Sequence, residues 1–245
     1  MRWSRALVTL PMMASTRRGL NLIFDADDTL WDSNVHFLQA EVDFIEVLVR
    51  AGVSDRALIR EALTRHELSI IESHGYGRRP YVMALERAMA ELAAAASQQA
   101  IRMEIERIAT RLLDRHCELL PDVAATLGEL SQRHRLLLFT KGQPQEQMRK
   151  LEHSGLRPLF SRIGIPLEKN QAAYELLLAQ AGLDAADTVM IGNSPRSDIN
   201  PALRAGLSAV YIPHPHTWEL EQENIDPAAD RLITLTRFRR LLEVF

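Results

Sequence analysis

The stretch NLIFDADDTLWDS, residues 21–33, passes directly from a short apolar run into three aspartates within four positions. Apolar runs of this length are typical of buried strands. Like charges so close together repel and raise one another's pKa, so a fold keeps them together only where something positive lies among them. The stretch therefore predicts a strand that ends at a site for a cation or a cationic partner.

Apolar runs of strand length recur along the chain, and four of them lie in its second half. Helix-period segments separate those four, and each ends at a glycine, which a helix C-cap favours. This alternation predicts an α/β fold, a doubly wound parallel sheet whose chemistry lies at the carboxyl ends of its strands. The predicted strands are 20–24, 136–140, 162–166, 188–192 and 209–213, and the predicted helices between them are 143–154, 171–181 and 198–205.

Residues 34–117 follow a helical pattern almost throughout, which is far longer than the single helix that a crossover needs. We therefore predict an inserted α-helical cap domain at 34–117. The catalytic core would then consist of 19–33 and 118–245, with the cap folded against the active edge of its sheet.

The helical pattern breaks at SHGYGRR, residues 73–79, which contains two glycines. Tyr76 is a candidate for stacking on a substrate, and Arg78 or Arg79 for pairing with a second anionic group. A solvent-exposed turn between helices is the alternative interpretation of this segment.

The composition is that of an ordinary globular protein, with 47% hydrophobic and 25% charged residues and a net charge of −3. That balance gives no electrostatic footprint for nucleic acid or an anionic membrane. The single Cys117 cannot form an internal disulfide, which favours a reducing compartment such as the cytoplasm. Residues 1–18 resemble a signal peptide only faintly, and we expect a disordered arm or a true start at Met12 or Met13. The sequence carries no signal for an oligomeric state.

Carboxylates gather where the first strand ends. Asp25 terminates the strand and Asp27 follows at the same edge, whereas Asp28 points elsewhere and is expected to be a structural turn residue. A carboxylate at this edge can hold a hard cation such as Mg²⁺ or attack phosphorus as a covalent nucleophile. Capping of a turn or helix is the alternative role for these aspartates.

Polar residues also follow two other strands. Thr140 offers a hydroxyl after the second strand, and the backbone amides of Thr140 and Lys141 suit a phosphoryl oxygen. The turn GNSPRSD brings Asn193 and Asp198 to the same edge. Because the carboxyl ends of parallel strands meet there, these groups are expected to converge with Asp25.

A fixed positive charge is the remaining need, and the chain has only three lysines. Lys150 lies inside an amphipathic helical segment, away from a strand end. Lys169 opens a helix just past the third predicted strand, at the active edge. We therefore expect Lys169 to supply the charge, with Lys141 as its rival.

Together these segments resemble the four motifs of the haloacid dehalogenase-like (HAD) hydrolase superfamily. Those motifs are a strand-end DxDxT, a Ser or Thr after the second strand, a lysine, and a final acidic turn. Here they are Asp25–Thr29, Thr140, Lys169 and Gly192–Asp198, in the family's order and with a helical insertion after the first. The resemblance covers 20–213 and implies a Rossmann-like core with a cap of the C1 type.

The resemblance implies a magnesium-dependent phosphatase that acts on a small phosphorylated metabolite. Asp25 would attack the substrate phosphorus in line and form an aspartyl-phosphate, while Mg²⁺ and Lys169 neutralise charge on the equatorial oxygens. Asp27 would protonate the leaving oxygen and afterwards deprotonate the hydrolytic water. Thr140 and the Lys141 amide would hold the phosphoryl oxygens.

The implied magnesium ligands are the Asp25 carboxylate, the Asp27 main-chain carbonyl and a group from the last motif. Asn193 stands where the family most often has an aspartate, and its neutral oxygen lowers the negative charge of the site by one. Asp198 is the other candidate ligand, directly or through a water. We expect magnesium binding to be weaker than with two carboxylates.

Three alternatives share the resemblance. A 2-haloacid dehalogenase needs no acid two residues after the nucleophile, because halide leaves unprotonated, so Asp27 favours phosphate esters. A phosphomutase would share the chemistry but exclude water. A non-catalytic protein of this fold would serve as a binding or regulatory module, and phosphate release from p-nitrophenyl phosphate distinguishes it from an enzyme.

Two further segments have simpler interpretations. Trp31 is expected to pack in the flap after the nucleophile. His214 and His216 are expected to lie in a loop after the last strand, because no third ligand for a metal is visible beside them.

Overall fold

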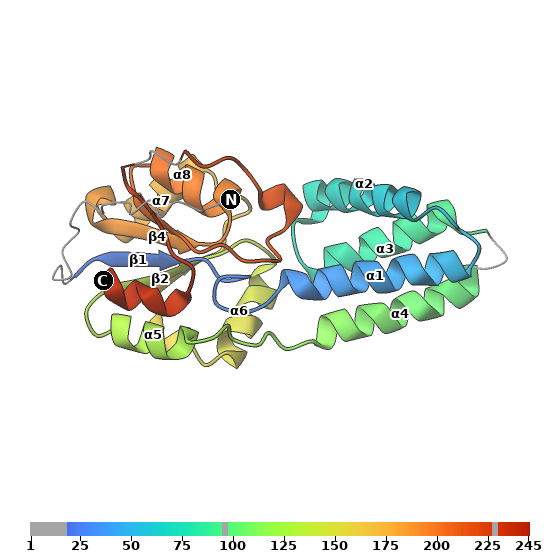
Figure 1. Ribbon diagram of the computed structural model, residues 1–245, viewed down its shortest axis with the longest axis horizontal. Coiled ribbons are helices and arrows are strands. Elements are labelled where there is room, and N and C mark those ends of the chain that lie inside the picture. The colour runs from blue at the N-terminus through green and yellow to red at the C-terminus, as the bar shows by residue number, and fades with distance from the viewer. Residues whose placement is uncertain (1–18, 95–97, 227–229) are drawn as a thin grey trace, which may run out of the picture.

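The computed structural model of the chain describes residues 19–94, 98–226 and 230–245. The predicted arm at 1–18 lies outside the described residues. The molecule is elongated, with a sheet-containing core at one end and four long helices at the other, their axes along the long dimension (Figure 1).

The core contains a parallel sheet with the strand order β3-β2-β1-β4-β5-β6. The central strand β1 pairs with β2 and β4, so that Phe24 aligns with Leu138 on one side and Ile191 on the other. The residues that follow these strands therefore meet at one edge, which confirms the predicted doubly wound α/β fold. The strands are β1 (Asn21–Phe24), β2 (Arg135–Phe139), β3 (Arg162–Gly164), β4 (Thr188–Gly192), β5 (Ser208–Tyr211) and β6 (Leu232–Thr234).

Alternate side chains of β1 serve two separate layers, because successive residues of a strand point to opposite faces. Leu22 and Phe24 pack with residues of α5 and α6, whereas Ile23 packs with residues of α7 and α8. Figure 1 shows the two pairs of helices on opposite sides of the sheet. These helices are α5 (Val123–Leu130), α6 (Pro144–His153), α7 (Gln171–Ala181) and α8 (Asn200–Arg204).

Three core elements differ from the sequence predictions, and one of them is the helix α5, which was not predicted. The strand β6 was not predicted, since three residues are too few for a recognisable alternation. The helix expected at 198–205 begins only at Asn200, because a π-helical turn, Pro195–Ile199, precedes it.

The four long helices pack around a hydrophobic core of their own, which includes the fully buried Phe44, Ile59 and Leu85. They occupy the interval in which a cap was predicted. The division into core and cap at 33/34 and 117/118 remains a prediction, which the separate hydrophobic cores support. The helices are α1 (Asn34–Arg50), α2 (Arg56–His74), α3 (Arg78–Leu92) and α4 (Gln98–Asp114).

The turn between α2 and α3 is where the cap helices approach the core. Gly75 and Gly77 there have φ angles of +74° and +139°, which disfavour other residues. A Cβ on Gly77 would lie 3.0 Å from the Glu146 carboxylate of α6. The glycines therefore allow the turn to sit directly on the core.

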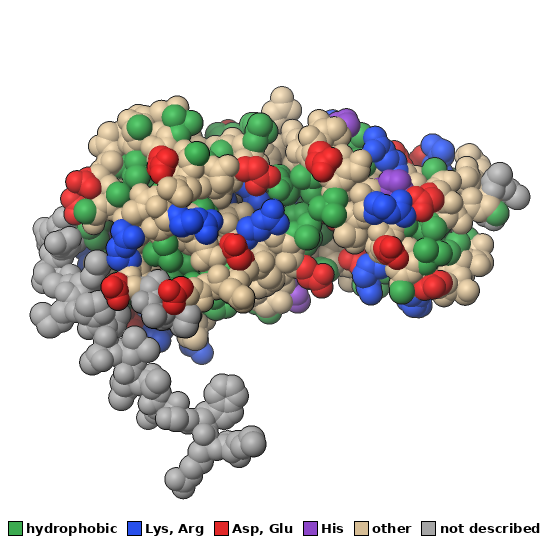
Figure 2. Space-filling view, turned by 90° about the horizontal axis from the view of Figure 1, so that it is seen from above, with side chains coloured by type: hydrophobic (Ala, Val, Ile, Leu, Met, Phe, Trp, Pro, Cys, Tyr) green, Lys and Arg blue, Asp and Glu red, His purple; other side chains and the backbone are tan. Residues whose placement is uncertain are grey.

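In the described residues, no helix is both long enough and apolar enough to cross a membrane. On the face seen in Figure 2, acidic and basic side chains are interspersed over the core and the cap helices.

Candidate active site

Asp25 leaves the end of β1 as a buried carboxylate, 6% exposed, with a buried lysine beside it. Lys169 Nζ lies 2.5 Å from Asp25 Oδ1 and also contacts the Phe139 carbonyl at the end of β2. The Thr29 hydroxyl lies 3.0 Å from the other Asp25 oxygen. The first motif and the lysine are thus in direct contact, whereas they are 144 residues apart in the chain.

The π-helical turn after β4 brings Asp198 to the same lysine. Its wide turn carries the Asp198 carboxylate back over the chain, where Oδ2 accepts a hydrogen bond from the Ser194 amide at 2.9 Å. The other Asp198 oxygen pairs with Lys169. A Cβ on Gly192 would collide with this carboxylate at 2.2 Å, so glycine is required there.

Asn193 faces the site with its amide oxygen. Its nitrogen donates to the Thr217 hydroxyl at 2.9 Å, which orients the amide so that Oδ1 lies 3.1 Å from the Thr29 hydroxyl. That hydroxyl is the one that also contacts Asp25. The Asn193 oxygen and the Asp25 carboxylate therefore converge on one point.

The charges of this group do not balance within the described residues. Asp25 and Asp198 share the single ammonium of Lys169, and both carboxylates are buried. Burial raises the pKa of Asp25 although Lys169 opposes the shift, and burial with repulsion from Asp25 raises the pKa of Asp198 to about 7. The surplus of negative charge favours a further cation, and with Asn193 the donors are all oxygens, which suit Mg²⁺.

Asp27 lines the same cavity but belongs to a different network. Lys150 Nζ lies 2.9 Å and 3.0 Å from its two carboxylate oxygens. Trp31 Nε1 donates to Oδ1 at 2.6 Å, and Gln147 Nε2 donates to Oδ2 at 2.9 Å. Burial disfavours the charged carboxylate, but Lys150 and Gln147 outweigh it and lower the pKa of Asp27. Asp27 is therefore held in its ionised form.

The structure gives Lys150 and Trp31 a contact with Asp27 that sequence analysis did not predict. Lys169 was preferred to Lys150 because Lys150 lies inside an amphipathic helix, but α6 buries its face with Gln147, Lys150 and Leu151. The scarcity of lysine was the available signal, since all three lysines line this cavity. Trp31 is fully buried, as expected for packing, and adds an indole hydrogen bond.

The cavity between the sheet edge and the cap helices has a volume of about 160 Å³. Thr140 and Lys141 line it from the end of β2, as predicted from their place in the sequence. Lys141 Nζ pairs with Glu221 at 2.7 Å and lies 4.3 Å from the centre of the Tyr76 ring. The Tyr76 hydroxyl donates to Glu168 at 2.6 Å, so the cap turn closes over the core through this ring.

A loop after β5 completes the wall, and sequence analysis did not assign it to the site. Trp218 lines the cavity and makes an edge-to-face contact with Tyr76, with ring centres 6.1 Å apart. Glu221 accepts a hydrogen bond from Ser194 at 2.5 Å. Trp218 and Glu221 in this loop were the features of the sequence that could have indicated a role in the site.

Arg78 and Arg79 do not line this cavity. The Arg78 guanidinium is buried and donates to the Arg115 carbonyl at 2.6 Å and to Cys117 Sγ at 3.1 Å. Its Nε lies 3.5 Å from Glu146. The proposed pairing of these arginines with a substrate anion disagrees with this placement, and Arg78 instead ties α3 to the chain segment that returns to the core.

Asp28 has the structural role predicted for it. It adopts a φ of +61°, and its Oδ1 accepts hydrogen bonds from the amides of Ser33 and Asn34 at 2.8 Å and 3.0 Å, which caps the start of α1. Burial raises its pKa to about 7 although these amides oppose the shift.

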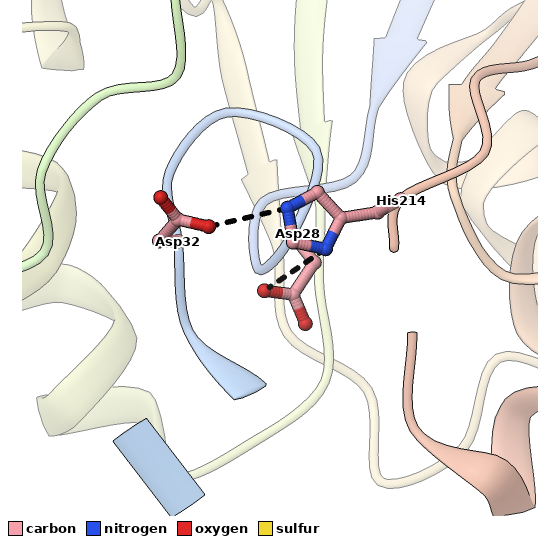
Figure 3. Close-up of side chains that lie close together, drawn as sticks. All are labelled: Asp28, Asp32 and His214. Atoms are coloured by element: carbon pink, nitrogen blue, oxygen red, sulfur yellow. Dashed lines mark hydrogen bonds and ion pairs between the residues drawn. The ribbon is translucent and has the colours of Figure 1, made fainter. Parts of the chain in front are cut away.

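His214 lies between Asp28 and Asp32, with one ring nitrogen toward each carboxylate (Figure 3). Nε2 is 3.1 Å from Asp32, and Nδ1 is 3.8 Å from Asp28 and accepts from the His216 amide. These three side chains are close enough to surround a metal ion. Each already has a partner, so in this conformation the group fastens the start of the cap to the loop after β5.

The sequence model of the haloacid dehalogenase-like hydrolases matches residues 21–206. The chain belongs to this family. The family predicted from the four motifs is thus confirmed.

Relatives and solved structures agree with this assignment. A haloacid dehalogenase-like family hydrolase from Xanthomonas campestris has a TM-score of 0.76 and 28% identity, over 93% of this chain and 95% of that one. Glyceraldehyde 3-phosphate phosphatase from Methanopyrus kandleri is 26% identical over 91% of this chain and 95% of its own. Human N-acylneuraminate-9-phosphatase is 33% identical, but the match spans only 41% of this chain and 42% of that protein.

Proposed function

We propose that this HAD-like hydrolase is a magnesium-dependent phosphatase that hydrolyses a small phosphate monoester through an aspartyl-phosphate intermediate. One observation carries the proposal: Asp25 and Asp27 line the same cavity but have different partners. Asp25 lies beside the buried ammonium of Lys169, and Asp27 belongs to a separate hydrogen-bond network that contains Lys150. Two carboxylates in different environments are suited to different roles.

Asp25 is the nucleophile in this proposal. Its Oδ2 attacks the substrate phosphorus, the bond from phosphorus to the leaving oxygen breaks, and the phosphoryl group is transferred to the carboxylate. Lys169, the Thr140 hydroxyl and the Lys141 amide stabilise the phosphoryl oxygens. Asp198 acts as a positioning residue, since it pairs with the same Lys169 ammonium that contacts Asp25.

Asp27 is the proton carrier. Because Asp27 rests as a carboxylate, it first takes the proton that a monoanionic phosphate ester carries and then gives that proton to the leaving oxygen. The regenerated carboxylate takes a proton from the water that attacks the aspartyl-phosphate. Lys150, Gln147 and Trp31 favour the ionised carboxylate, which is the form that accepts this second proton.

Magnesium would be held by the Asp25 carboxylate, the Asp27 main-chain carbonyl and the Asn193 amide oxygen. The structure supports Asn193 over Asp198 as the direct ligand, because both Asp198 oxygens already bond to Lys169 and to the Ser194 amide. When bound, the ion would neutralise charge on the phosphoryl group. The surplus negative charge of the buried carboxylates supports this assignment.

Phosphate esters are favoured over organic halides as substrates. A halide leaves without a proton, whereas an ester oxygen needs one, and Asp27 lies in the cavity to supply it. The phosphatase names of the relatives from human and Methanopyrus kandleri support the same choice. The cytoplasm remains the proposed location, on the grounds of the single cysteine.

A screen for released phosphate tests the proposal. The panel starts with p-nitrophenyl phosphate, N-acylneuraminate 9-phosphate, glyceraldehyde 3-phosphate and phosphoserine, the last three suggested by the names of relatives. Release that requires Mg²⁺ and stops when a chelator is added is the expected result. No magnesium-dependent release across a broad panel would refute the enzyme assignment.

A further inference from the structure

The cavity extends from the sheet edge into the cap helices, where aromatic and aliphatic side chains line it. Phe37 lies on α1, Ile71 on α2 and Tyr81 on α3. Phe37 and Tyr81 form an edge-to-face pair with ring centres 5.2 Å apart. Glu67 joins them, one helical turn before Ile71 on the same face of α2.

Glu67 differs from the other acidic side chains that line the cavity. Among the described residues it has neither an ion pair nor a hydrogen bond to its carboxylate. Every other acid of the lining has at least one such partner. Lys169 pairs with Asp25 and Asp198, Lys150 with Asp27 and Glu146, Lys141 with Glu221, and backbone amides bond to Asp28.

Glu67 lies near aromatic rings and near the negative charge of Glu41, and the cap part of the lining supplies no cation. The cap residues of the lining include no lysine, arginine or histidine. Burial and repulsion from Glu41 on α1 raise the pKa of Glu67 to about 7, and Glu41 itself pairs with Arg60. A carboxylate beside aromatic faces is the chemistry that binds an ammonium group.

We propose that the organic part of the substrate carries a protonated amine at its far end, which binds Glu67 between Phe37 and Tyr81. This inference rests on the proposed phosphatase function and names the substrate class of the same site. The length of α2 places Glu67 well away from the contact of this helix with the core. The His74 carbonyl at the end of α2 contacts Gln143 of the core, and Glu67 lies seven residues earlier, on the order of 10 Å along the axis. The amine is therefore expected several carbon atoms away from the phosphate group and not next to it.

The test is a series of ω-aminoalkyl phosphates of increasing length, each compared with the n-alkyl and ω-hydroxyalkyl phosphates of equal length. The short aminoethyl ester should gain nothing. At lengths that reach Glu67, kcat/KM for the amine should exceed that for the alkyl ester by about 10-fold or more. Glu67→Gln should abolish the advantage, and Glu67→Asp should keep it but shift it to a longer chain.

Glu72→Gln is the matched control, because it removes a carboxylate from an exposed position on the same helix and should leave the advantage intact. Three results would overturn the inference. They are a kcat/KM for the amine that is no higher at any length, a gain that survives in Glu67→Gln, and the same gain in the hydroxyl series. If no ester is hydrolysed, the proposed function fails instead. Calorimetric binding of ω-aminoalkyl and n-alkyl phosphonates to the same variants then decides the role of Glu67, with the amine expected to bind more tightly only where the carboxylate is present.

Discussion

The two halves of the cavity differ in how their charges are paired. At the sheet edge, Asp25 and Asp27 each lie beside an ammonium group, and backbone geometry fixes their positions. In the cap half, Glu67 lies near aromatic rings without a cation. The core half is thus organised for the phosphoryl group, which all phosphate esters share. The cap half leaves one charge free for the part of the substrate that varies.

The largest loss of activity is expected from Asp25→Asn, which removes the nucleophile of the core half. An amide cannot form the aspartyl-phosphate, so kcat should fall by at least ~10³-fold on every ester. Phosphate release measures the loss, and circular dichroism checks that the variant is folded. Turnover within about ten-fold of the unmodified protein would mean that another group attacks phosphorus.

Lys150→Met is expected to impair only the proton transfer by Asp27, because it removes the ammonium that positions this carboxylate. Turnover of an n-alkyl phosphate should fall by about 10- to 100-fold, since a misplaced proton carrier serves the leaving oxygen poorly. Turnover of p-nitrophenyl phosphate should fall less, because its leaving group departs without a proton.

Lys150→Arg is the matched control, since it keeps a cation at this position and should recover most of the turnover. Equal losses on the two esters in Lys150→Met would point to a general loss of structure, and would count against a positioning role toward Asp27.

Asn193→Asp tests whether residue 193 binds the magnesium ion directly. An added carboxylate should tighten magnesium binding by roughly 3- to 10-fold, as measured by titration of activity against Mg²⁺. The gain is limited because the amide hydrogen bond to Thr217 is lost. Asn224→Asp makes the same charge change at an exposed position outside the cavity and should have no effect. Unchanged affinity in Asn193→Asp would contradict its assignment as the direct ligand.

The smallest effect is expected where the two halves are fastened together. His214→Ala removes the hydrogen bond to Asp32, which is worth about 1 kcal/mol, and should lower the melting temperature by ~2–4 °C. His216→Ala is the control, because its hydrogen bonds to His214 and Asn34 use the backbone and the variant loses only a ring contact with His214. Equal melting temperatures for the two variants would show that His214 does not stabilise this junction.

The core half could be predicted from the sequence because its geometry follows from the sheet. Residues at the carboxyl ends of neighbouring parallel strands must meet, so Asp25, Thr140 and Asn193 converge without knowledge of any helix packing. Lys169 could be predicted for the same reason, since it follows shortly after the strand β3. The π-helical turn that carries Asp198 was not foreseen, but its residues still arrive at the same edge.

The cap half could not be predicted in this way, because periodicity identifies a helix but not the neighbour that each face meets. Glu67 and Lys150 both look like solvent-facing charges of amphipathic helices. Tertiary packing turns each of them toward the cavity. Arg78 shows the opposite outcome, since a glycine-flanked arginine that suggested substrate binding is used to tie the cap helices to the returning chain.

The central claim is that Asp25 carries the phosphoryl group during turnover. Acid quenching of the enzyme with a hydrolysed ester and Mg²⁺, followed by mass spectrometry of the peptide that contains Asp25, tests it directly. We predict one added phosphoryl group on that aspartate within the first turnovers and none in Asp25→Asn. Turnover without any phosphoryl group on Asp25, or with the group on another residue, would contradict the account.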